Sequence, residues 1–326
     1  LIHAATMVTA GVFMVARMSP LFHYAEATNI FMILIGASTA IFAASIAITQ
    51  NDIKRVIAYS TCSQLGYMFF AAGVGAYNAS IFHLMTHGFF KSLLFLCAGS
   101  VIHSMFNEQD MRKMGGLSKK MPITTVLMWI GSLSIIGFPY FSGYFSKESI
   151  MEAAFLSNTY MGMSAYLIGV ITTILTAFYS WRLLFLTFHG DNRSSKEIFE
   201  KVHESSAIII IPLVFLAIGT LVSGLLFVNL LTGNESIEFW KDSITIVTHN
   251  NLHMPFIQIF LIKLSTALGI ILAIIFYYYK KNLPKILSNN FKTLYLISFN
   301  KWYVDELYKK LFIDPIFYLA KFFWKK

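Results

Sequence analysis

Long apolar blocks follow one another along almost the whole chain, and they limit the folds that it can adopt. Each block holds about 20 residues with few charges, which is the length of an α-helix that crosses the hydrocarbon core of a bilayer. Hydrophobic residues make up 56% of the 326 residues and charged residues 13%, against about a quarter charged in soluble domains. The sequence therefore predicts an all-α polytopic membrane protein and excludes disordered, collagenous and disulfide-rich secreted proteins.

The blocks predict a transmembrane helix bundle with seven complete spans and one partial span. The partial span comes first and begins at Leu1, which is typical of a helix cut by a fragment boundary. The fifth block is too long for one straight helix and contains Gly137-Phe138-Pro139, so we expect two half-helices joined by a break. The blocks lie near residues 1–18, 28–49, 53–76, 78–103, 122–156, 162–189, 206–231 and 256–280.

Basic residues in the short loops predict how the spans are oriented. The formal net charge is +9, from 25 Lys and Arg against 16 Asp and Glu. If the connections alternate sides and the broken block crosses once, most loop Lys and Arg fall on one side, which places that side in the cytoplasm or matrix. The charge then indicates anionic lipid and topology, with no nucleic acid as partner. The residues on this side are Lys54, Arg55, Arg112, Lys113, Lys119, Lys120, Arg193, Lys196, Lys201, Lys280, Lys281 and Lys285.

The last stretch, from about residue 282 to 326, has a different pattern. Lysines and aromatic residues are interleaved there, and no uncharged run is long enough to cross a bilayer. We expect a C-terminal amphipathic lateral helix that lies along the membrane interface. The alternative is a disordered basic tail, but aromatic and aliphatic residues are too frequent for one.

Three ionisable residues of the fourth block, His83, His87 and Lys91, are spaced i, i+4, i+8 and therefore share one face of a helix. A charged residue at mid-bilayer costs about 2.5 to 3.5 kcal/mol on insertion scales, so such residues usually face a polar interior and mark an ion path. The triple therefore predicts a proton relay. The alternatives are core histidines bonded to backbone carbonyls, and a zinc site. The zinc site lacks a third ligand and the Glu of the protease motif.

Lys147 is the second candidate, because it follows the predicted break. A broken helix exposes backbone groups that are tolerated at membrane depth only beside a polar cavity, and transporters place ion sites there. The alternative is an interfacial ion pair with Glu148.

His3, alone on an apolar helix, is by itself more typical of a satisfied core residue. The sequence contains no nucleotide-binding, flavin or iron–sulfur motif, so we expect no cofactor and no metal in this chain.

Four motifs, in the same order, closely resemble the antiporter-like proton-pumping subunits of respiratory complex I, above all the largest and most distal of the three. The motifs are LIHAATMV at 1–8, DIKRVIAYST at 52–61, HLMTHGFFK at 83–91 and GYFSKE at 143–148. A further run, WYVDELY at 302–308, is similar to the start of that subunit's lateral helix.

The resemblance implies a fold of two inverted five-helix repeats. The chain would then hold the last helix of a first repeat (1–27), the whole second repeat (28–189), two additional transmembrane helices (190–281) and the start of the lateral helix (282–326). The Glu and Lys pair of the family's first repeat has no counterpart here. The resemblance also implies that Lys91 is the central lysine, that His83 and His87 are its relay neighbours, that Lys147 lies on the broken helix leading to the exit, and that His3 links the two half-channels.

The function implied by the resemblance is proton translocation coupled to quinone reduction elsewhere in NADH:quinone oxidoreductase. NADH, FMN, iron–sulfur clusters and quinone would bind partner subunits. The partners would be lipid and other membrane subunits of complex I, especially adjacent antiporter-like subunits. We expect the bacterial inner membrane, or alternatively the mitochondrial inner membrane. The competing hypotheses are a subunit of a cation/proton antiporter or of a membrane-bound hydrogenase, and a structural clamp without transport.

Overall fold

The computed structural model describes residues 2, 6–246 and 254–324. The chain divides into two compact units, Leu1–Lys281 and Asn282–Lys326. The described residues form helices and no strand, apart from one isolated β-bridge between Asp52 and Asp110. The all-α class predicted from the apolar blocks is therefore confirmed.

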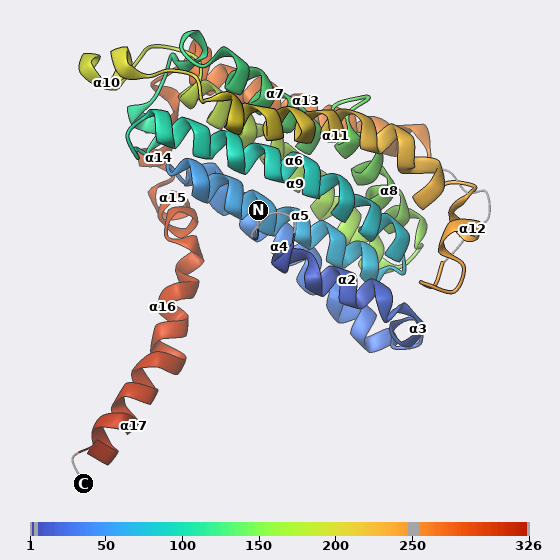
Figure 1. The fold of residues 1–326 in the computed structure, drawn as a ribbon. Helices are drawn as coiled ribbons and strands as arrows, with labels where there is room; N and C mark the ends of the chain where they lie inside the picture. The colour runs from blue at the N-terminus through green and yellow to red at the C-terminus, as the bar shows by residue number, and fades with distance from the viewer. Residues whose placement is uncertain (1, 3–5, 247–253, 325–326) are drawn as a thin grey trace. The chain divides into compact units, whose positions relative to one another are not determined.

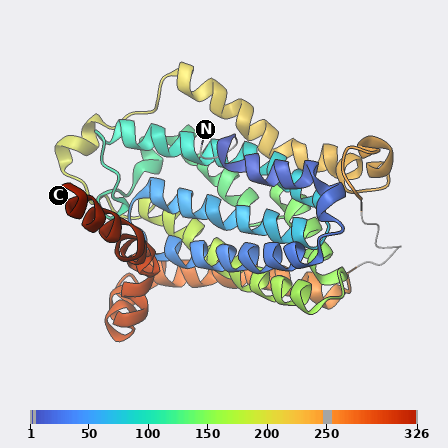
Figure 2. The ribbon, with the colours of Figure 1, turned by 90° about the horizontal axis from the view of Figure 1, so that it is seen from below.

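The first unit is a bundle of long helices that lie side by side (Figures 1 and 2). Five of its described helices are long and apolar enough to cross a membrane: α4, α6, α9, α11, and α13 with the π-helical turn that follows it. The bounds are α2 (Ala10–Arg17), α3 (Ser19–Phe22), α4 (Glu26–Thr49), α5 (Ile53–Gly73), α6 (Tyr77–Ser104), α7 (Pro122–Ile135), α8 (Ser142–Leu156), α9 (Tyr160–Thr187), α10 (Lys196–Lys201), α11 (Ala207–Leu231), α12 (Ser236–Trp240), α13 (Phe256–Ile274) and η4 (Ile275–Tyr279).

Two of the predicted spans differ from those five helices for physical reasons. The helix α5 has 21 residues, but its many polar residues lower its hydropathy, and it lies among α2, α4, α6, α8 and α9. The fifth block forms two helices, α7 and α8, of 14 and 15 residues. Each is shorter than the roughly 20 residues that a single span needs, so only the two together have the length of a crossing.

The break between α7 and α8 lies where the sequence predicts it. Gly137 has a φ of 75° and Tyr140 a φ of 70°, so the backbone leaves the right-handed helix there. The two halves touch directly, because the backbone N–H of Gly143 donates to the hydroxyl of Ser134 at 3.1 Å. A Cβ on Gly143 would overlap the carbonyl oxygen of Ser134. Glycine is therefore required at this contact.

Glycines also bring α4 and α5 into close contact. A Cβ on Gly66 would lie 2.5 Å from the carbonyl oxygen of Gly36, and a Cβ on Gly36 would lie 2.5 Å from the backbone nitrogen of Phe70. Small residues at a helix crossing let the two backbones approach, as in many membrane bundles. This contact holds α5, which carries several polar side chains, in the interior of the bundle.

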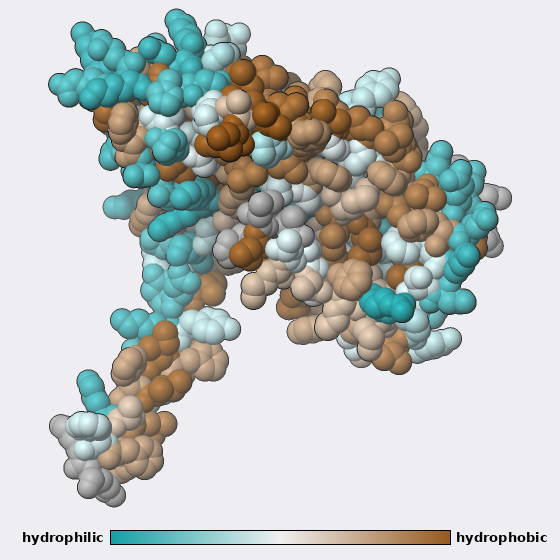
Figure 3. Space-filling model, viewed as in Figure 1, coloured by the Kyte–Doolittle hydropathy of each residue, from teal (hydrophilic) through white to brown (hydrophobic). Residues whose placement is uncertain are grey.

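The outer surface of the first unit has an apolar band between two polar ends (Figure 3). Side chains of α11 belong to this band, since large apolar residues of that helix are exposed. They include Ile208, Ile211, Phe215, Ile218, Leu221, Leu225 and Leu226. An exposed apolar surface of this extent suits lipid and not water. The protein is therefore a multi-pass membrane protein.

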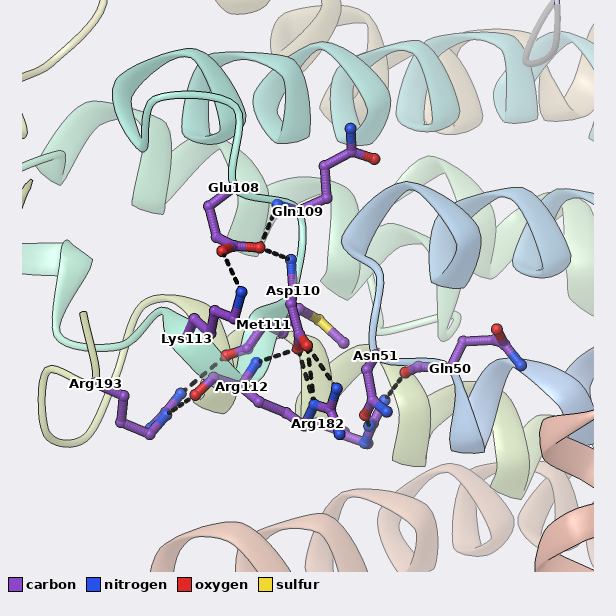
Figure 4. Close-up of polar contacts among 10 residues, drawn as sticks. All are labelled: Gln50, Asn51, Glu108, Gln109, Asp110, Met111, Arg112, Lys113, Arg182 and Arg193. Atoms are coloured by element: carbon purple, nitrogen blue, oxygen red, sulfur yellow. Dashed lines mark hydrogen bonds and ion pairs between the residues drawn. The ribbon is translucent and has the colours of Figure 1, made fainter. Parts of the chain in front are cut away.

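The loops predicted to share one side meet at one end of the bundle, which we call the basic end (Figure 4). The backbone N–H of Met111 donates to the carbonyl of Asn51 at 2.9 Å, which joins the α4–α5 and α6–α7 loops. Arg193 donates to the carbonyl oxygens of Met111 and Arg112, and Lys281 pairs with Asp191 at 2.7 Å.

A buried arginine of α9 ties these loops to the bundle. Arg182 donates to the carbonyl of Gln50 and to Oδ1 of Asn51 at 2.7 Å (Figure 4). It also donates to the hydroxyl of Tyr277 at 3.0 Å. Only 5% of Arg182 is exposed. Its guanidinium group therefore satisfies backbone and amide oxygens that would otherwise be buried without a donor.

The second unit is a series of short helices where the sequence predicts one amphipathic helix. Lys301, Trp302 and Tyr303 have φ angles of 56°, 57° and 56°. A left-handed backbone costs about 1 to 2 kcal/mol per residue for L-amino acids, and here it interrupts the helical path. The elements are α14 (Leu283–Asn290), α15 (Lys292–Phe299), η5 (Lys301–Tyr303), α16 (Val304–Tyr308), η6 (Lys309–Ile313) and α17 (Asp314–Trp324).

Candidate functional site

The three ionisable residues of α6 lie on one buried face of the helix. His83 is 1% exposed, and His87 and Lys91 are 0% exposed. The ring centroids of His83 and His87 are 6.1 Å apart, and Phe90 contacts both rings. The structure therefore places the triple on one buried face of α6, inside the bundle.

His83 connects α6 with two other helices. Its Nδ1 lies 2.9 Å from the hydroxyl of Ser146 on α8, and its Nε2 lies 3.1 Å from Oε1 of Gln64 on α5. The Ser146 hydroxyl also lies 2.7 Å from the hydroxyl of Thr86. In this arrangement the ring can donate from Nε2 to Gln64 and accept at Nδ1 from Ser146. Both nitrogens therefore have side-chain partners, unlike the carbonyl-bonded core histidine that is the alternative.

Lys91 is fully buried and has two oxygen partners on α5. Its Nζ donates to the hydroxyl of Ser60 at 2.6 Å and to the carbonyl of Ile57 at 3.4 Å. Neither oxygen belongs to a carboxylate. A buried ammonium group next to neutral oxygens is costly unless it is hydrogen-bonded, so the Ser60 contact is the main stabilising contact of Lys91.

Lys147 follows Ser146 on α8 and is 3% exposed. Its Nζ lies 5.0 Å from the centre of the Tyr67 ring, and no hydrogen-bond partner is found for it in the described part of the chain. It lines a cavity of about 200 Å³ between the helix break and α13, together with Glu148 and Lys263. The described contacts contain no ion pair between Lys147 and Glu148, so the interfacial pair that we consider as the alternative is not formed.

The remaining predicted candidate, His3, lies outside the described residues. Within the described ranges, no group of three His, Cys, Asp or Glu side chains could hold a metal ion. The two cysteines, Cys62 and Cys97, are free thiols.

Several site residues are not found by the sequence reasoning. Arg182 and Lys263 carry a detectable signal, because each is a charged residue inside an apolar block. Thr86 and Ser146 carry none, since hydroxyl groups are common in transmembrane helices and only the packing of α5, α6 and α8 shows which of them meet. Ser60 and Gln64 are visible in the sequence as polar residues, but their partners are not.

Comparison with known proteins shows the family to which the chain belongs. The family model for the transmembrane region of NADH:quinone oxidoreductase and Mrp antiporters matches residues 1–176. The chain belongs to this NADH:quinone oxidoreductase/Mrp antiporter family. The matched range includes His83, His87 and Lys91 on α6, and Lys147 on α8.

Relatives within this family include bacterial and plant proteins. The chain is 46% identical over 338 aligned residues to NADH-quinone oxidoreductase subunit L of Rickettsia bellii, an alignment that covers 99% of this chain and 51% of that protein. It is 51% identical over 252 residues to NADH-ubiquinone oxidoreductase chain 5 of Marchantia polymorpha, with coverages of 77% and 38%. The chain thus spans about half the length, or less, of the curated relatives that it matches.

The fold is also similar to that of a chain in a solved membrane complex. A chain of the Mrp complex from Dietzia sp. DQ12-45-1b matches with a TM-score of 0.71 and 27% identity, over 90% of this chain and 31% of that chain. The antiporter-like architecture expected from the motifs is therefore confirmed, and the similarity to subunit L and chain 5 agrees with the resemblance to the most distal complex I subunit.

Proposed function

We propose that this chain translocates protons across a membrane as a subunit of NADH:quinone oxidoreductase, driven by quinone reduction in other subunits. NADH, FMN, iron–sulfur clusters and quinone would bind those partner subunits, and the adjacent membrane subunits would be antiporter-like. The similarity to subunit L and chain 5 supports this assignment. The basic end would face the cytoplasm or matrix.

The observation that carries the proposal is the buried stripe of Lys91, His87, His83 and, through Ser146, Lys147. Charged or titratable groups are rarely placed inside a membrane protein without a function, because their burial is unfavourable. Here they form a series across α6 and α8 rather than a single isolated group. The series can pass a proton only if neighbours exchange it stepwise, and His83 already contacts Ser146.

The cavity beside Lys147 would provide the continuation of this path. It is bounded by the helix break, where backbone groups are exposed, and by α13. Glu148 and Lys263 line it, so polar groups lie on both sides of the space. Water in such a cavity would let Lys147 exchange its proton, and we propose that this is the exit of the path.

The experiment that tests the proposal measures NADH-driven proton uptake by inverted membrane vesicles from cells that carry the full-length gene. Lys91→Ala is compared with wild type, and assembly is checked on a native gel. We expect uptake per NADH to fall while the complex remains assembled. Lys54→Ala, which changes an exposed lysine at the start of α5, is the control and should retain wild-type uptake.

Unchanged uptake in Lys91→Ala would contradict the relay and favour the structural-clamp hypothesis. Equal losses in Lys91→Ala and Lys54→Ala would point to a general effect of charge on assembly or topology. Comparison of Lys147→Ala then separates the central lysine from the proposed exit.

A second candidate function is a subunit of a cation/proton antiporter, and the match to the Mrp complex favours it. An antiporter would exchange a cation for protons without NADH. Vesicles given a Na⁺ gradient but no NADH would then show Lys91-dependent proton movement. The higher identity to the complex I subunits supports the first candidate.

A further inference from the structure

Two hydroxyl groups extend the buried stripe beyond Lys91. The hydroxyl of Ser60, which accepts from Nζ of Lys91 at 2.6 Å, lies 2.6 Å from the hydroxyl of Tyr179. All three side chains are buried, and each comes from a different helix: α6, α5 and α9. Both distances are in the range of strong hydrogen bonds. Lys91, Ser60 and Tyr179 therefore form an unbroken line of hydrogen-bonded atoms.

This line lies on the side of Lys91 that faces the basic end. Ser60 is two turns from the start of α5 at Ile53, and Tyr179 is about two turns before the end of α9 at Thr187. His83 and His87 precede Lys91 on α6, which runs toward the basic end. Lys91 thus has histidines on one side and hydroxyl groups on the other.

The line ends close to groups that reach the surface of the protein. Arg182 follows Tyr179 by one turn of α9, and it binds Gln50, Asn51 and Tyr277. Tyr277 is half-buried. The permanent charge of Arg182 is unfavourable for an excess proton that rests nearby, so a proton that enters here would move on to Lys91 rather than stay.

We propose that Ser60 and Tyr179 are the groups through which Lys91 takes up its proton from the basic end. This inference rests on the proposed function, and it adds two residues to the path. Resemblance and spacing point only to the histidines and lysines. The hydroxyl line instead follows from the packing of three helices.

The proton count of this uptake step balances. When Lys91 is neutral, Tyr179 O–H donates to Ser60 Oγ, and Ser60 O–H donates to the lone pair of Lys91 Nζ. A hydronium ion gives a proton to the Tyr179 oxygen and becomes water, the original Tyr179 proton moves to Ser60, and the original Ser60 proton moves to Nζ. Three O–H bonds break, one each in hydronium, Tyr179 and Ser60, while two O–H bonds and one N–H bond form, so one proton is transferred from hydronium to Lys91.

After this step Nζ is charged and donates to Ser60 Oγ across the same 2.6 Å contact. Before the next uptake, Lys91 must release its proton and both hydroxyl groups must turn. A hydroxyl group can do this because it is both donor and acceptor. A residue that lacks the hydroxyl interrupts the line without removing any charge.

The test uses the assembled complex with the full-length chain. The difference in NADH-driven proton uptake between wild type and Lys91→Ala defines the Lys91-dependent uptake. We expect Tyr179→Phe, which removes one oxygen atom, to lower the rate of this uptake about tenfold or more, in line with the loss of a proton-transfer group. Tyr166→Phe is the matched control, because Tyr166 is a buried tyrosine of the same helix whose hydroxyl donates to the carbonyl of Gln258.

Substitutions of Ser60 give an independent test, and they distinguish a role in proton transfer from a role in helix packing. Ser60→Ala should reduce the Lys91-dependent uptake, and Ser60→Thr, which restores a hydroxyl, should recover most of it. The remaining uptake in Tyr179→Phe should also show a larger rate decrease in D₂O than wild type. If Tyr179→Phe does not assemble, the comparison of Ser60→Ala with Ser60→Thr decides.

The outcomes distinguish this inference from the proposed function. If Lys91→Ala loses uptake while Tyr179→Phe and Ser60→Ala keep it, proton uptake through the two hydroxyl groups is refuted, and the proposed proton translocation is retained. If Ser60→Ala and Ser60→Thr lose uptake equally, Ser60 acts through packing and the inference is overturned. If Lys91→Ala itself keeps uptake, the proposed function fails first.

Discussion

The Nζ atom of Lys147 lies 5.0 Å from the centre of the Tyr67 ring, and the hydroxyl of the same tyrosine donates to the carbonyl of Gly169 at 2.6 Å. The ring is therefore held from α9 while its face is turned to the lysine. Such a contact between a cation and an aromatic ring contributes about 0.5 to 2 kcal/mol. It gives Lys147 a defined position at the edge of the cavity.

This contact predicts different effects for two substitutions of Tyr67. Tyr67→Leu removes the ring and is expected to lower NADH-driven proton uptake up to about tenfold, because Lys147 loses its fixed position. Tyr67→Phe keeps the ring and should retain more uptake than Tyr67→Leu. Vesicle assays on the assembled complex check this, and equal uptake in the two variants would show that the ring does not position Lys147.

The α4–α5 crossing predicts a loss of stability in Gly66→Ala. The new methyl group would lie 2.5 Å from the carbonyl oxygen of Gly36, and forced overpacking of this kind costs about 1 to 3 kcal/mol. Gly99→Ala is the control, since nothing lies within 4 Å of its Cβ position. Gly99→Ala should be neutral or slightly stabilising. Thermal unfolding of the complex in detergent measures both, and equal midpoints would contradict the tight crossing.

The buried guanidinium of Arg182 predicts that lysine cannot replace it. Lysine presents a point charge and cannot reach Gln50, Asn51 and Tyr277 at once, so Arg182→Lys leaves buried acceptors without a donor, at a cost of about 1 to 3 kcal/mol. We expect faster proteolysis at the α4–α5 loop. Arg55→Lys, at an exposed site whose ion-pair distance is 3.9 Å, should leave the cleavage rate unchanged. Similar cleavage rates in the two variants would show that the hydrogen bonds of Arg182 are not needed to hold the α4–α5 loop.

Asp110, in the α6–α7 loop, predicts a pH dependence of stability. The hydrogen bond from the Arg112 guanidinium lowers the pKa of this carboxyl group below its ordinary value of 3.8. Its contribution is therefore fully present above pH 3.8 and is lost as the pH falls from there through the lowered pKa. Because the pair is at the surface, the effect is at most about 1 kcal/mol.

Unfolding curves of wild type and Asp110→Asn between pH 7 and about pH 2 test this dependence. The two midpoints should differ above pH 3.8 and approach each other as the pH falls below 3.8. Asp242→Asn, at an exposed carboxylate of the α11–α13 connection, serves as the comparison. A constant difference between wild type and Asp110→Asn over the whole range would contradict the assignment.

The helices were predictable because bilayer thickness sets their length. The blocks near 28–49, 78–103 and 206–231 match α4 (Glu26–Thr49), α6 (Tyr77–Ser104) and α11 (Ala207–Leu231) closely. The break was predictable because Gly137 and Pro139 cannot continue a straight helix. The three left-handed residues at 301–303 were not, since Lys, Trp and Tyr carry no local signal for such a turn.

The site was predictable only where spacing along the sequence determines it. Lys91, His83 and His87 share a face by spacing alone, and Lys147 follows a visible break. Their partners depend on which helices pack together. Nothing in the sequence says that Ser146 meets His83 or that Tyr179, 119 residues away from Ser60, meets its hydroxyl. These contacts link segments that only the folded bundle brings together.

The contact between Gly143 and Ser134 has a consequence for how such a path can switch. A broken helix is often taken for a hinge, but here the first turn of α8 is packed against the last turn of α7 with no room for a methyl group. Bending at that point would separate a backbone contact without replacing it. We therefore expect the gate to consist of rotating side chains and rearranging water within a rigid frame. Such a gate would switch far faster than a movement of whole helices.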